Sequence, residues 1–562
     1  MTFDHFSDLN PPDIDIEAVT ARYEALLGAL AEADGAGQIA VVERWDALRR
    51  ELETWQAHIR LRFYQDTRDA ACKAAYERAD DLRPRIVNLD VRMKRALLSS
   101  PERAAIEARF GGHAFDLWEC DVAAFAPEIQ EDMVKEARLK AAYTELRASA
   151  ELTFQGQTHT LAGIARFALD PDPAVRAEAA GVKWGWYAEH GAAFDQIFHD
   201  LVQVRHKMAH ALGYEDFVGL GYKLMQRVDY DKADVDRFRA QVRDHLVPLV
   251  AELRQEQADR LGLNPMCEWD EGLLDAGDPP KPLGDTPFLV EQARDMFKAM
   301  GDEPDAFYTE IVAKGLLDLD TRPGKGGGAF CTAFPDQRAP FVFGNFNGTL
   351  NDVRTFTHEL GHAFQYWTSR DNALTEYLWP TYEACEIHSM GLEFLTLPHI
   401  ERFFSPEDAE RFRRDHLVGA LMFIPYGVAV DHFQHLVYES PEATPEERHA
   451  MWQQMERTYL PWRRYGDLAW PAKGGLWQQQ LHIYGAPFYY IDYTLAQTCA
   501  LQIFLRASED WQGAIDDYIA LCHRGGEAPF QDLAVSAGLT SPFDPGCLEA
   551  VVDALRPLLR AA

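Results

Sequence analysis

Two histidines and a glutamate lie at a spacing that suits metal-dependent chemistry, in the run His-Glu-Leu-Gly-His at residues 358–362. On an α-helix, residues four positions apart lie on one face, so His358 and His362 can direct their imidazoles at one metal ion. Glu359 leaves the helix at a neighbouring angle, from which its carboxylate can take a proton from a metal-bound water. The alternative is structural: a helix with two buried histidines and a solvated glutamate.

A catalytic zinc ion needs a third protein ligand and an open fourth position. Three acids, Glu383, Glu386 and Glu393, lie on the next helical stretch, residues 381–397. Glu386 and Glu393 are two turns apart on one face, so one can bind the metal while the other holds a histidine ring. A solvated acidic face is the alternative. The apolar residues between these acids indicate a buried helix, however, where a carboxylate needs a cation or a hydrogen-bond donor.

The two segments together resemble a known family. Residues 356–364 read Phe-Thr-His-Glu-Leu-Gly-His-Ala-Phe, and residues 386–393, which begin 24 positions after the second histidine, read Glu-Ile-His-Ser-Met-Gly-Leu-Glu. This layout resembles the oligoendopeptidase F and thimet oligopeptidase family of zinc metallopeptidases, and most closely its Pz-peptidase-like branch. In that family the third ligand opens a Glu-x-x-Ser-x-x-x-Glu pattern at this distance.

The resemblance implies an activity and a ligand set. One zinc ion per chain is expected on His358, His362 and Glu386, with Glu393 holding a histidine ring. The implied reaction is hydrolysis of internal bonds in short peptides by a zinc-activated water, with Glu359 as the general base. Two rivals remain open. One is a zinc carboxypeptidase or dipeptidyl carboxypeptidase of similar layout, and the other is a metal-free helical peptide-binding protein.

A tyrosine-rich block begins at His482 and reads His-Ile-Tyr-Gly-Ala-Pro-Phe-Tyr-Tyr-Ile-Asp-Tyr. Related enzymes carry a histidine followed by a tyrosine-rich helix, and these groups donate hydrogen bonds to the tetrahedral intermediate. The resemblance therefore implies His482 with Tyr493, and after it Tyr490, as donors. The spacing departs by about one residue from the commoner family pattern, so other tyrosines of the block stay open, and aromatic core packing accounts for some of them. These other candidates are Tyr489 and Tyr484.

A glycine-rich run at residues 326–328 opens a predicted hairpin of two strands, 329–334 and 341–346. The family keeps a small sheet along its substrate channel at this place, so the resemblance implies that the edge of the hairpin binds peptide backbone by β-augmentation. The alternative is a hairpin that only packs on the zinc helix. The residues expected to bind substrate are Gly328, Ala329, Phe330 and Tyr489.

Helical patterns account for most of the remaining chain. Residues 16–110 place apolar side chains at helical intervals, with Pro84 and Pro101 expected near helix boundaries. Further helices are expected at about 131–260, and from Asp352 almost to the end. The sequence predicts a mainly α protein with one small β-sheet beside the zinc helix.

The resemblance adds an organisation to this fold class. It implies two helical halves around a deep substrate channel that excludes folded proteins. The matching blocks run from about Gly326 to Tyr493, and the earlier part of the chain contains no specific motif. We therefore expect an N-terminal helical region at residues 1–150 and the zinc metallopeptidase catalytic region at residues 151–562.

Composition and charge limit the partners. The 562 residues include 55 Lys and Arg against 89 Asp and Glu, and the net charge of −34 argues against nucleic acid, whose phosphates require excess basic residues. The N-terminus lacks the pattern of a secretory signal, and no run of about 18 apolar residues predicts a membrane span. Eight cysteines without a Cys-x-x-Cys pair fit reduced thiols. We expect a cytoplasmic protein that binds short peptides, and neither nucleic acid nor a membrane; no oligomeric state is predicted.

Overall fold

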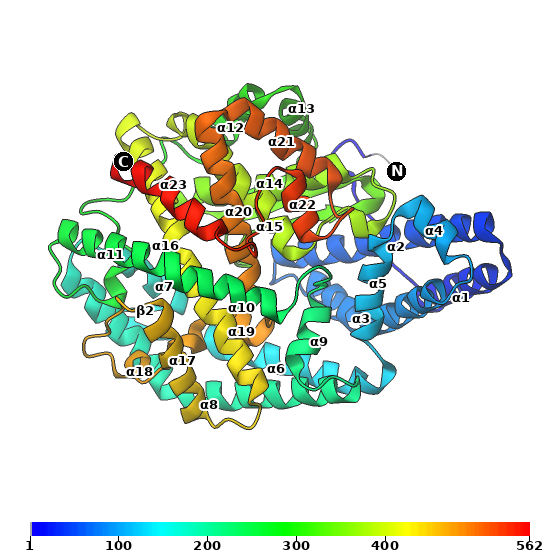
Figure 1. Cartoon of the computed structure of the whole chain (residues 1–562), viewed down its shortest axis with the longest axis horizontal. Coiled ribbons are helices and arrows are strands. Elements are labelled where there is room, and N and C mark those ends of the chain that lie inside the picture. The colour runs from blue at the N-terminus through cyan, green and yellow to red at the C-terminus, as the bar shows by residue number, and fades with distance from the viewer. Residues whose placement is uncertain (1–2, 562) are drawn as a thin grey trace.

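Helices form most of residues 3–561, the part of the chain that this computed structural model describes (Figure 1). The mainly α prediction is confirmed. The α-helices are α1 (Ile16–Glu32), α2 (Gly35–Gln65), α3 (Ala70–Leu98), α4 (Arg103–Phe110), α5 (His113–Ala123), α6 (Gln130–Ala148), α7 (Leu161–Ala165), α8 (Pro173–Ala211), α9 (Phe217–Leu224), α10 (Lys232–Gln241), α11 (Val247–Leu261), α12 (Thr286–Met300), α13 (Asp302–Ala313), α14 (Leu350–Ser369), α15 (Tyr382–Leu395), α16 (Pro406–Glu439), α17 (Pro445–Tyr459), α18 (Ala469–Ala472), α19 (Leu481–Gly485), α20 (Tyr490–Glu509), α21 (Trp511–Arg524), α22 (Phe530–Ser536) and α23 (Cys547–Ala561). The strands are β1 (Leu152–Phe154), β2 (Gln157–His159), β3 (Leu317–Asp320), β4 (Phe330–Phe334) and β5 (Ala339–Phe346).

The first five helices form a bundle with a core of its own. Leu374 and Tyr377, from the segment between α14 and α15, complete that core. In Figure 1 these helices, drawn in blue, extend from one side of the body. Pro101 separates α3 from α4 as predicted, but the boundary expected at Pro84 was wrong, because α3 continues through it. Asp80, whose carbonyl loses its helical partner to Pro84, is exposed, so water can satisfy that carbonyl. The division of the chain at residue 150 stays a prediction.

The predicted hairpin is present as β4 and β5, which pair antiparallel from Phe330 opposite Phe343 to Phe334 opposite Ala339. A third strand, β3, pairs parallel with β5 and was not predicted, so the strand order is β3-β5-β4. β4 is therefore an edge strand, and both β4 and β5 pack against α14. This places the small sheet beside the helix of the two histidines, as expected.

A second sheet, the β1–β2 hairpin, was also not predicted. Its strands have three residues each, too few to show the alternation of apolar and polar residues that predicts a strand. Gln155 and Gly156 join them with φ angles of 50° and 73°, which is the conformation that a tight hairpin turn requires. The expectation of a single sheet was therefore wrong, because the β1–β2 hairpin forms a second one.

Three helices, α14, α15 and α20, lie near the centre of the molecule, where α15 packs against both of the others (Figure 1). Gly361 of α14 faces the backbone of α15. A Cβ atom at Gly361 would lie 2.6 Å from the carbonyl oxygen of His388 and 2.7 Å from the Cα of Ser389. The absent side chain is what allows these two helices to approach so closely.

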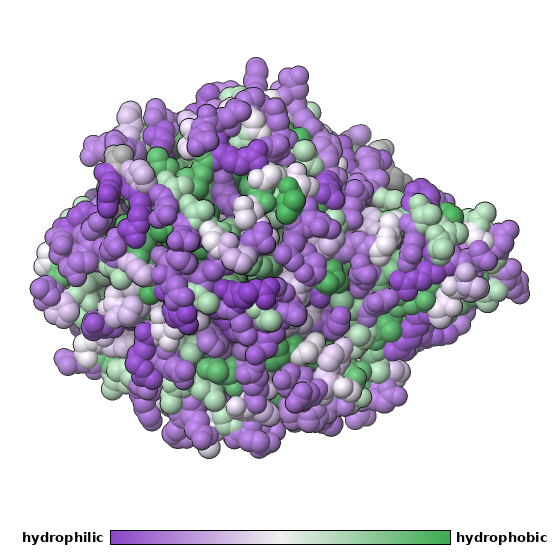
Figure 2. Space-filling view, in the orientation of Figure 1, coloured by the Kyte–Doolittle hydropathy of each residue, from purple (hydrophilic) through white to green (hydrophobic). Residues whose placement is uncertain are grey.

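One further helix, α16, has the length and composition of a membrane span in the described part of the chain. However, 72% of its most apolar window is buried inside the protein, as in the core helix of a folded domain. On the face shown in Figure 2 hydrophilic residues predominate and hydrophobic ones are scattered among them. α16 is therefore a core helix.

A buried ion pair joins the N-terminal bundle to the short 3₁₀ helix η7 (Thr375–Tyr377), which lies between α14 and α15. Arg49 of α2 donates to both carboxylate oxygens of Glu376, at 2.8 Å for the Nη2–Oε2 contact. Trp118 donates to the same carboxylate at 2.6 Å. Although burial opposes ionisation, Arg49 holds the pKa of Glu376 at about 2.

We predict that Glu376→Gln lowers the free energy of unfolding by about 3 kcal/mol, because it leaves Arg49 buried with a weaker partner. The pKa of Glu376 is lower in the folded state, so its contribution is present above about pH 4.5 and is lost as the pH falls towards 2. Denaturant titrations at pH 7 and pH 3 should therefore differ less for the variant than for the wild type.

The matched control is Glu51→Gln, which breaks the exposed pair between Arg22 and Glu51. An exposed ion pair contributes about 0–1 kcal/mol, so this variant should unfold almost like the wild type. Equal effects of the two substitutions would contradict a structural role for the buried pair.

Candidate metal centre

A capping box begins α14, the helix that carries the two histidines. The side chain of Thr349 accepts from the backbone of Asp352, and the Asp352 carboxylate accepts from the N–H groups of Thr349 and Gly348 at 3.2 and 2.6 Å. The first N–H groups of the helix are thereby satisfied without help from outside. The start of the helix, and with it the direction of each later side chain, is set locally.

His358, His362 and Glu386 are brought together between α14 and α15, with one ligand atom of each within 4.8 Å of the others. Glu386 Oε2 lies 3.4 Å from His358 Nε2 and 3.5 Å from His362 Nε2. Four ligands at about 2.0–2.1 Å around a tetrahedral zinc ion are separated by about 3.4 Å, so the three residues fit that metal. Two imidazole nitrogens and one carboxylate are also the donor types that zinc binds.

Surrounding side chains fix the orientation of these three. Glu393 Oε1 lies 2.7 Å from His358 Nδ1, an arrangement that places a hydrogen on Nδ1 and leaves Nε2 free for a metal. Ser389 donates to Glu386 Oε2 at 2.8 Å, and Tyr489 donates to Glu386 Oε1, also at 2.8 Å. Although burial opposes ionisation, the two imidazoles hold the pKa of Glu386 well below its usual range.

Glu359 lies in the same place without being one of the three grouped ligands. Its side chain is only 6% exposed, and its Oε2 atom is buried without a hydrogen-bond partner. Burial raises the pKa of the Glu359 carboxyl. A carboxylate with a spare oxygen and a raised pKa is suited to accepting a proton at neutral pH.

His482 and three tyrosines form an aromatic group beside Glu386. The ring of His482 lies 4.9 Å from that of Tyr490 and 5.8 Å from that of Tyr493, measured between centroids. Burial raises the pKa of both phenols, which keeps them protonated as donors, and lowers the pKa of His482. Tyr489 makes the direct contact with Glu386, whereas Tyr493 lines two cavities.

Tyr484, the remaining candidate, lies in the hydrophobic core. Its side chain is fully buried, its ring stacks on Tyr143 at 3.8 Å, and its hydroxyl donates to the carbonyl of Phe194 at 3.3 Å. Tyr484 is therefore a tyrosine of the hydrophobic core, and it does not join the group around Glu386.

A strained turn at Phe488 precedes the tyrosines, and the sequence carried no signal for it. Phe488 has a φ of 66°, a left-handed conformation that is uncommon for a bulky residue. Its N–H donates to Gln434 at 3.0 Å, and its carbonyl accepts from Arg227 at 2.6 Å. Its ring covers Gly221, where a Cβ would lie 2.5 Å away. Buried partners from α16, α9 and the segment that follows α9 thus hold the turn that directs Tyr489 towards Glu386.

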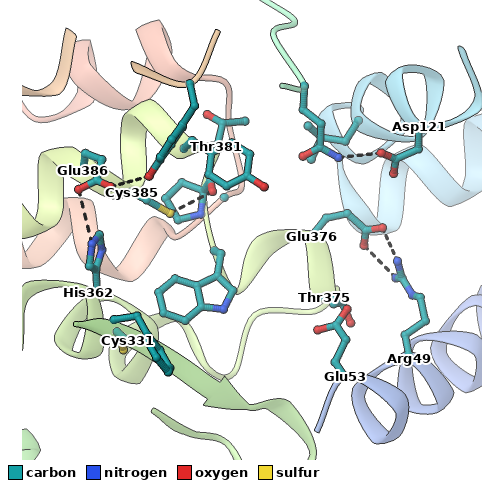
Figure 3. A pocket seen from close by; sticks show the side chains of 18 of the residues that line it. Arg49, Glu53, Asp121, Cys331, His362, Thr375, Glu376, Thr381, Cys385 and Glu386 are labelled. Atoms are coloured by element: carbon teal, nitrogen blue, oxygen red, sulfur yellow. Dashed lines mark hydrogen bonds and ion pairs between the residues drawn. The ribbon is translucent and has the colours of Figure 1, made fainter. Parts of the chain in front are cut away.

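A cavity of about 800 Å³ extends from the metal centre (Figure 3). Ala329, Phe330 and Tyr489, three of the four residues predicted to bind substrate, line it. Gly328, the fourth, is not among the lining residues, and its carbonyl accepts instead from the side chain of Asn345 at 2.7 Å. The edge of β4 therefore faces the cavity, as β-augmentation would need.

The far wall of this cavity comes from the N-terminal bundle and η7, and it was not predicted. Figure 3 shows Arg49, Glu53 and Glu376 across the cavity from His362 and Glu386. No motif marks these charges, because they lie on separate helices that only the tertiary fold brings together. The charged residues of this wall are Arg49, Glu53, Arg60, Asp90, Lys94, Asp121 and Glu376.

Comparison with known proteins gives two family matches. Residues 6–125 match the peptidase M3 N-terminal domain, and residues 295–552 match peptidase family M3. Among curated proteins, the chain is similar to oligopeptidase PepF of Bacillus subtilis (strain 168), with 23% identity over 290 residues. The matched stretch covers 48% of this chain and 42% of that relative, so the chain spans less than half the length of the curated protein.

Solved structures are similar over the whole chain. Pz peptidase A with a bound inhibitor has a TM-score of 0.94 and 39% identity, with 99% of both chains covered. A protein from Bacillus anthracis strain Ames, assigned to oligoendopeptidase F, has a TM-score of 0.90 and 38% identity, and the match covers 100% of this chain and 99% of that one.

We predict that Gly361→Ala pushes α14 away from α15, because the new methyl group meets backbone atoms that cannot turn aside. The expected cost is about 1–3 kcal/mol of unfolding free energy, measured in denaturant. Titration with Co²⁺ should also show weaker binding, because both histidines move relative to Glu386.

The control is Gly185→Ala, since Gly185 lies exposed in α8 with no atom within 4 Å of the added methyl group. Alanine is the better helix former, so this variant should be stabilised by about 0.5–1 kcal/mol. A Gly361→Ala protein as stable as the wild type would rule out close packing of α14 on α15.

Proposed function

The chain belongs to peptidase family M3, and from this premise we propose that it is a zinc-dependent endopeptidase that cleaves internal bonds of short peptides. The observation that carries the proposal is the convergence of His358, His362 and Glu386 at separations that fit a tetrahedral zinc ion. One ion per chain is expected. We also retain the expectation that the protein acts in the cytoplasm.

The zinc ion, when bound, polarises the scissile carbonyl and lowers the pKa of water towards about 7. Glu359 takes a proton from the attacking water and delivers it to the leaving amine, a role that suits its raised pKa and unpartnered oxygen. Glu393 keeps His358 in the tautomer that a ligand needs. No covalent intermediate with the protein is required.

Hydrogen-bond donors to the developing oxyanion complete the proposal. We assign this role to Tyr493 and His482, with Tyr490 as the alternative, because Tyr493 lines the cavity of the metal centre and the rings of His482 and Tyr490 lie 5.8 and 5.7 Å from its ring. One such donor contributes about 3 kcal/mol to the transition state. Tyr489 is already engaged by Glu386, so we assign it to holding that ligand and to the wall of the larger cavity.

The larger cavity supports short peptides as the substrate class. Its volume of about 800 Å³ lies within the range of small-ligand sites and is too small for a folded domain. Ala329 and Phe330 lie at the edge of β4, where an extended peptide can add as a strand. Main-chain recognition of this kind tolerates many side chains, as a peptidase of broad specificity would need.

A peptide blocked at both ends separates the proposal from its nearest rival. An endopeptidase cuts such a peptide, whereas a carboxypeptidase or dipeptidyl carboxypeptidase requires a free C-terminal carboxylate. Mass spectrometry of the products also locates the cut. Elemental analysis of protein purified without chelators tests the second rival, a metal-free peptide-binding protein, which would contain less than one zinc per chain.

We predict that Glu359→Gln lowers kcat at least 1,000-fold and leaves one zinc ion bound per chain, since the amide cannot accept the proton and Glu359 is not a ligand. Stopped assays with a fluorogenic peptide and elemental analysis of the same sample provide the two measurements. Near wild-type activity with full zinc content would refute the assignment of Glu359 as the base.

We predict the opposite pattern for Glu393→Gln, which weakens zinc affinity about 10- to 100-fold because His358 loses its charged partner. Competition with a chelator of known affinity measures the change, and activity should return when zinc is added in excess. The two glutamine variants serve as controls for each other. If Glu393→Gln retained zinc as tightly as Glu359→Gln does, Glu393 would have no part in orienting the ligand.

A further inference from the structure

A second cavity, of about 380 Å³, shares Tyr493 of the aromatic group with the first. It is lined by His482 and Tyr493, the assigned oxyanion donors, and by Arg354 and His416. Tyr493 borders both cavities, so the second opens directly beside the reacting centre. The remaining lining residues are Met390, Glu393, Gly419, Ala420, Phe423, Tyr490 and Gln497.

Arg354 differs from the deeply buried arginines of the protein. Arg205 and Arg227, for example, each pair with a carboxylate within 3.0 Å. Within residues 3–561, the guanidinium of Arg354 makes no hydrogen bond or ion pair, and its Nε atom is buried without a partner. A partly buried guanidinium with unused donors is a costly arrangement unless an anion from outside the chain completes it.

The acids near Arg354 already have other partners. Glu393 lies 2.7 Å from His358 and 3.5 Å from His416, and Asp415 accepts from Arg414 at 3.1 Å. His416 is 6% exposed and its Nδ1 atom is also buried without a partner. Among the residues that the structure describes, Arg354 is therefore a cation of the cavity wall without a partner, and His416 adds an unsatisfied ring nitrogen.

The rest of the wall is largely apolar. Met390, Ala420 and Phe423 present hydrocarbon surface, and Tyr490 adds the face of a ring. An occupant that matches both parts of the wall has an apolar body and a carboxylate. The C-terminal residue of a short peptide has this chemistry, and so does an Asp or Glu residue within one.

We propose that this second cavity is a carboxylate-binding subsite for the peptide substrate, with Arg354 as the residue that holds the carboxylate. A guanidinium offers two parallel donors to a carboxylate, which gives orientation as well as affinity. Holding the carboxylate at Arg354 sets the number of residues between it and the scissile bond. The inference rests on the proposed peptidase function and makes it more specific. The subsite would favour short peptides that carry a carboxylate at a fixed distance from the scissile bond.

The test compares four peptides that are identical except for the group under test. The first pair ends in a free carboxylate or in an amide, and the second pair, both amidated, carries Glu or Gln at one position. The wild type should show a kcat/KM about 10- to 100-fold higher for the carboxylate member of at least one pair, mainly through KM. The first pair detects a C-terminal carboxylate and the second a side-chain carboxylate.

Arg354→Gln should reduce that ratio to nearly one, and Arg354→Lys should retain part of it, because lysine keeps the charge without the paired donors. Arg457→Gln is the matched control, since Arg457 lies exposed on α17 and should leave the ratio unchanged. Zinc content is measured for each variant, because Arg354 and His358 are neighbours on α14. A wild-type ratio near one for both pairs, or a ratio that persists in Arg354→Gln, would overturn the subsite.

Calorimetric titration of the same peptides into Glu359→Gln, with and without Arg354→Gln, measures binding without turnover. If the wild type cut none of the peptides but binding still depended on the carboxylate and on Arg354, the peptidase proposal would fail and the subsite would stand. If cleavage and binding were the same with and without the carboxylate, the subsite proposal would be wrong and the peptidase proposal would stand.

Discussion

A carboxylate buried against two imidazoles is the interaction on which the centre of this protein depends. Glu386 lies inside the protein, where an isolated charge would cost several kcal/mol. His358 and His362 offset that cost, and the hydroxyls of Ser389 and Tyr489 occupy its two oxygens. The compensation works only while α14 and α15 remain close, which the glycine at their contact permits. A divalent cation placed between the same three groups would satisfy all of them at once.

Two distant parts of the chain complete this centre by packing around it. The turn at Phe488 adopts a conformation that its own residue type disfavours. It persists because Gln434 of α16 and Arg227, which follows α9, satisfy its backbone groups. The N-terminal bundle supplies the far wall of the larger cavity and is tied to η7 by Arg49 and Glu376. Both arrangements depend on contacts between segments that are far apart in sequence. The same tertiary packing therefore positions the tyrosines of the site and forms the wall of the larger cavity.

Much of the fold and part of the site could be predicted because their signals are local. Helical periodicity predicts most of the helices, and a glycine-rich run followed by two apolar stretches predicts the hairpin of β4 and β5. Prediction failed where a local signal was short or was overridden. The strands β1 and β2 are too brief to show a pattern. Pro84 lies inside a helix because Asp80, whose carbonyl loses its hydrogen bond there, is exposed to water. Gly328, which was expected to bind substrate, is not among the residues that line the cavity.

The sequence alone determined which residues can share one helical face, since a four-residue interval aligns His358 with His362 whatever surrounds them. Spacing alone left open which acid of the next helix meets the imidazoles, and the family resemblance named Glu386 for that place and Glu393 for the support of a ring. Tertiary structure decided that Glu386 faces them while Glu393 supports a ring, that Tyr484 belongs to the core, and that charges from the first helices form a cavity wall. Spacing along a helix is a property of the local backbone, whereas the approach of two helices depends on every side chain packed between them.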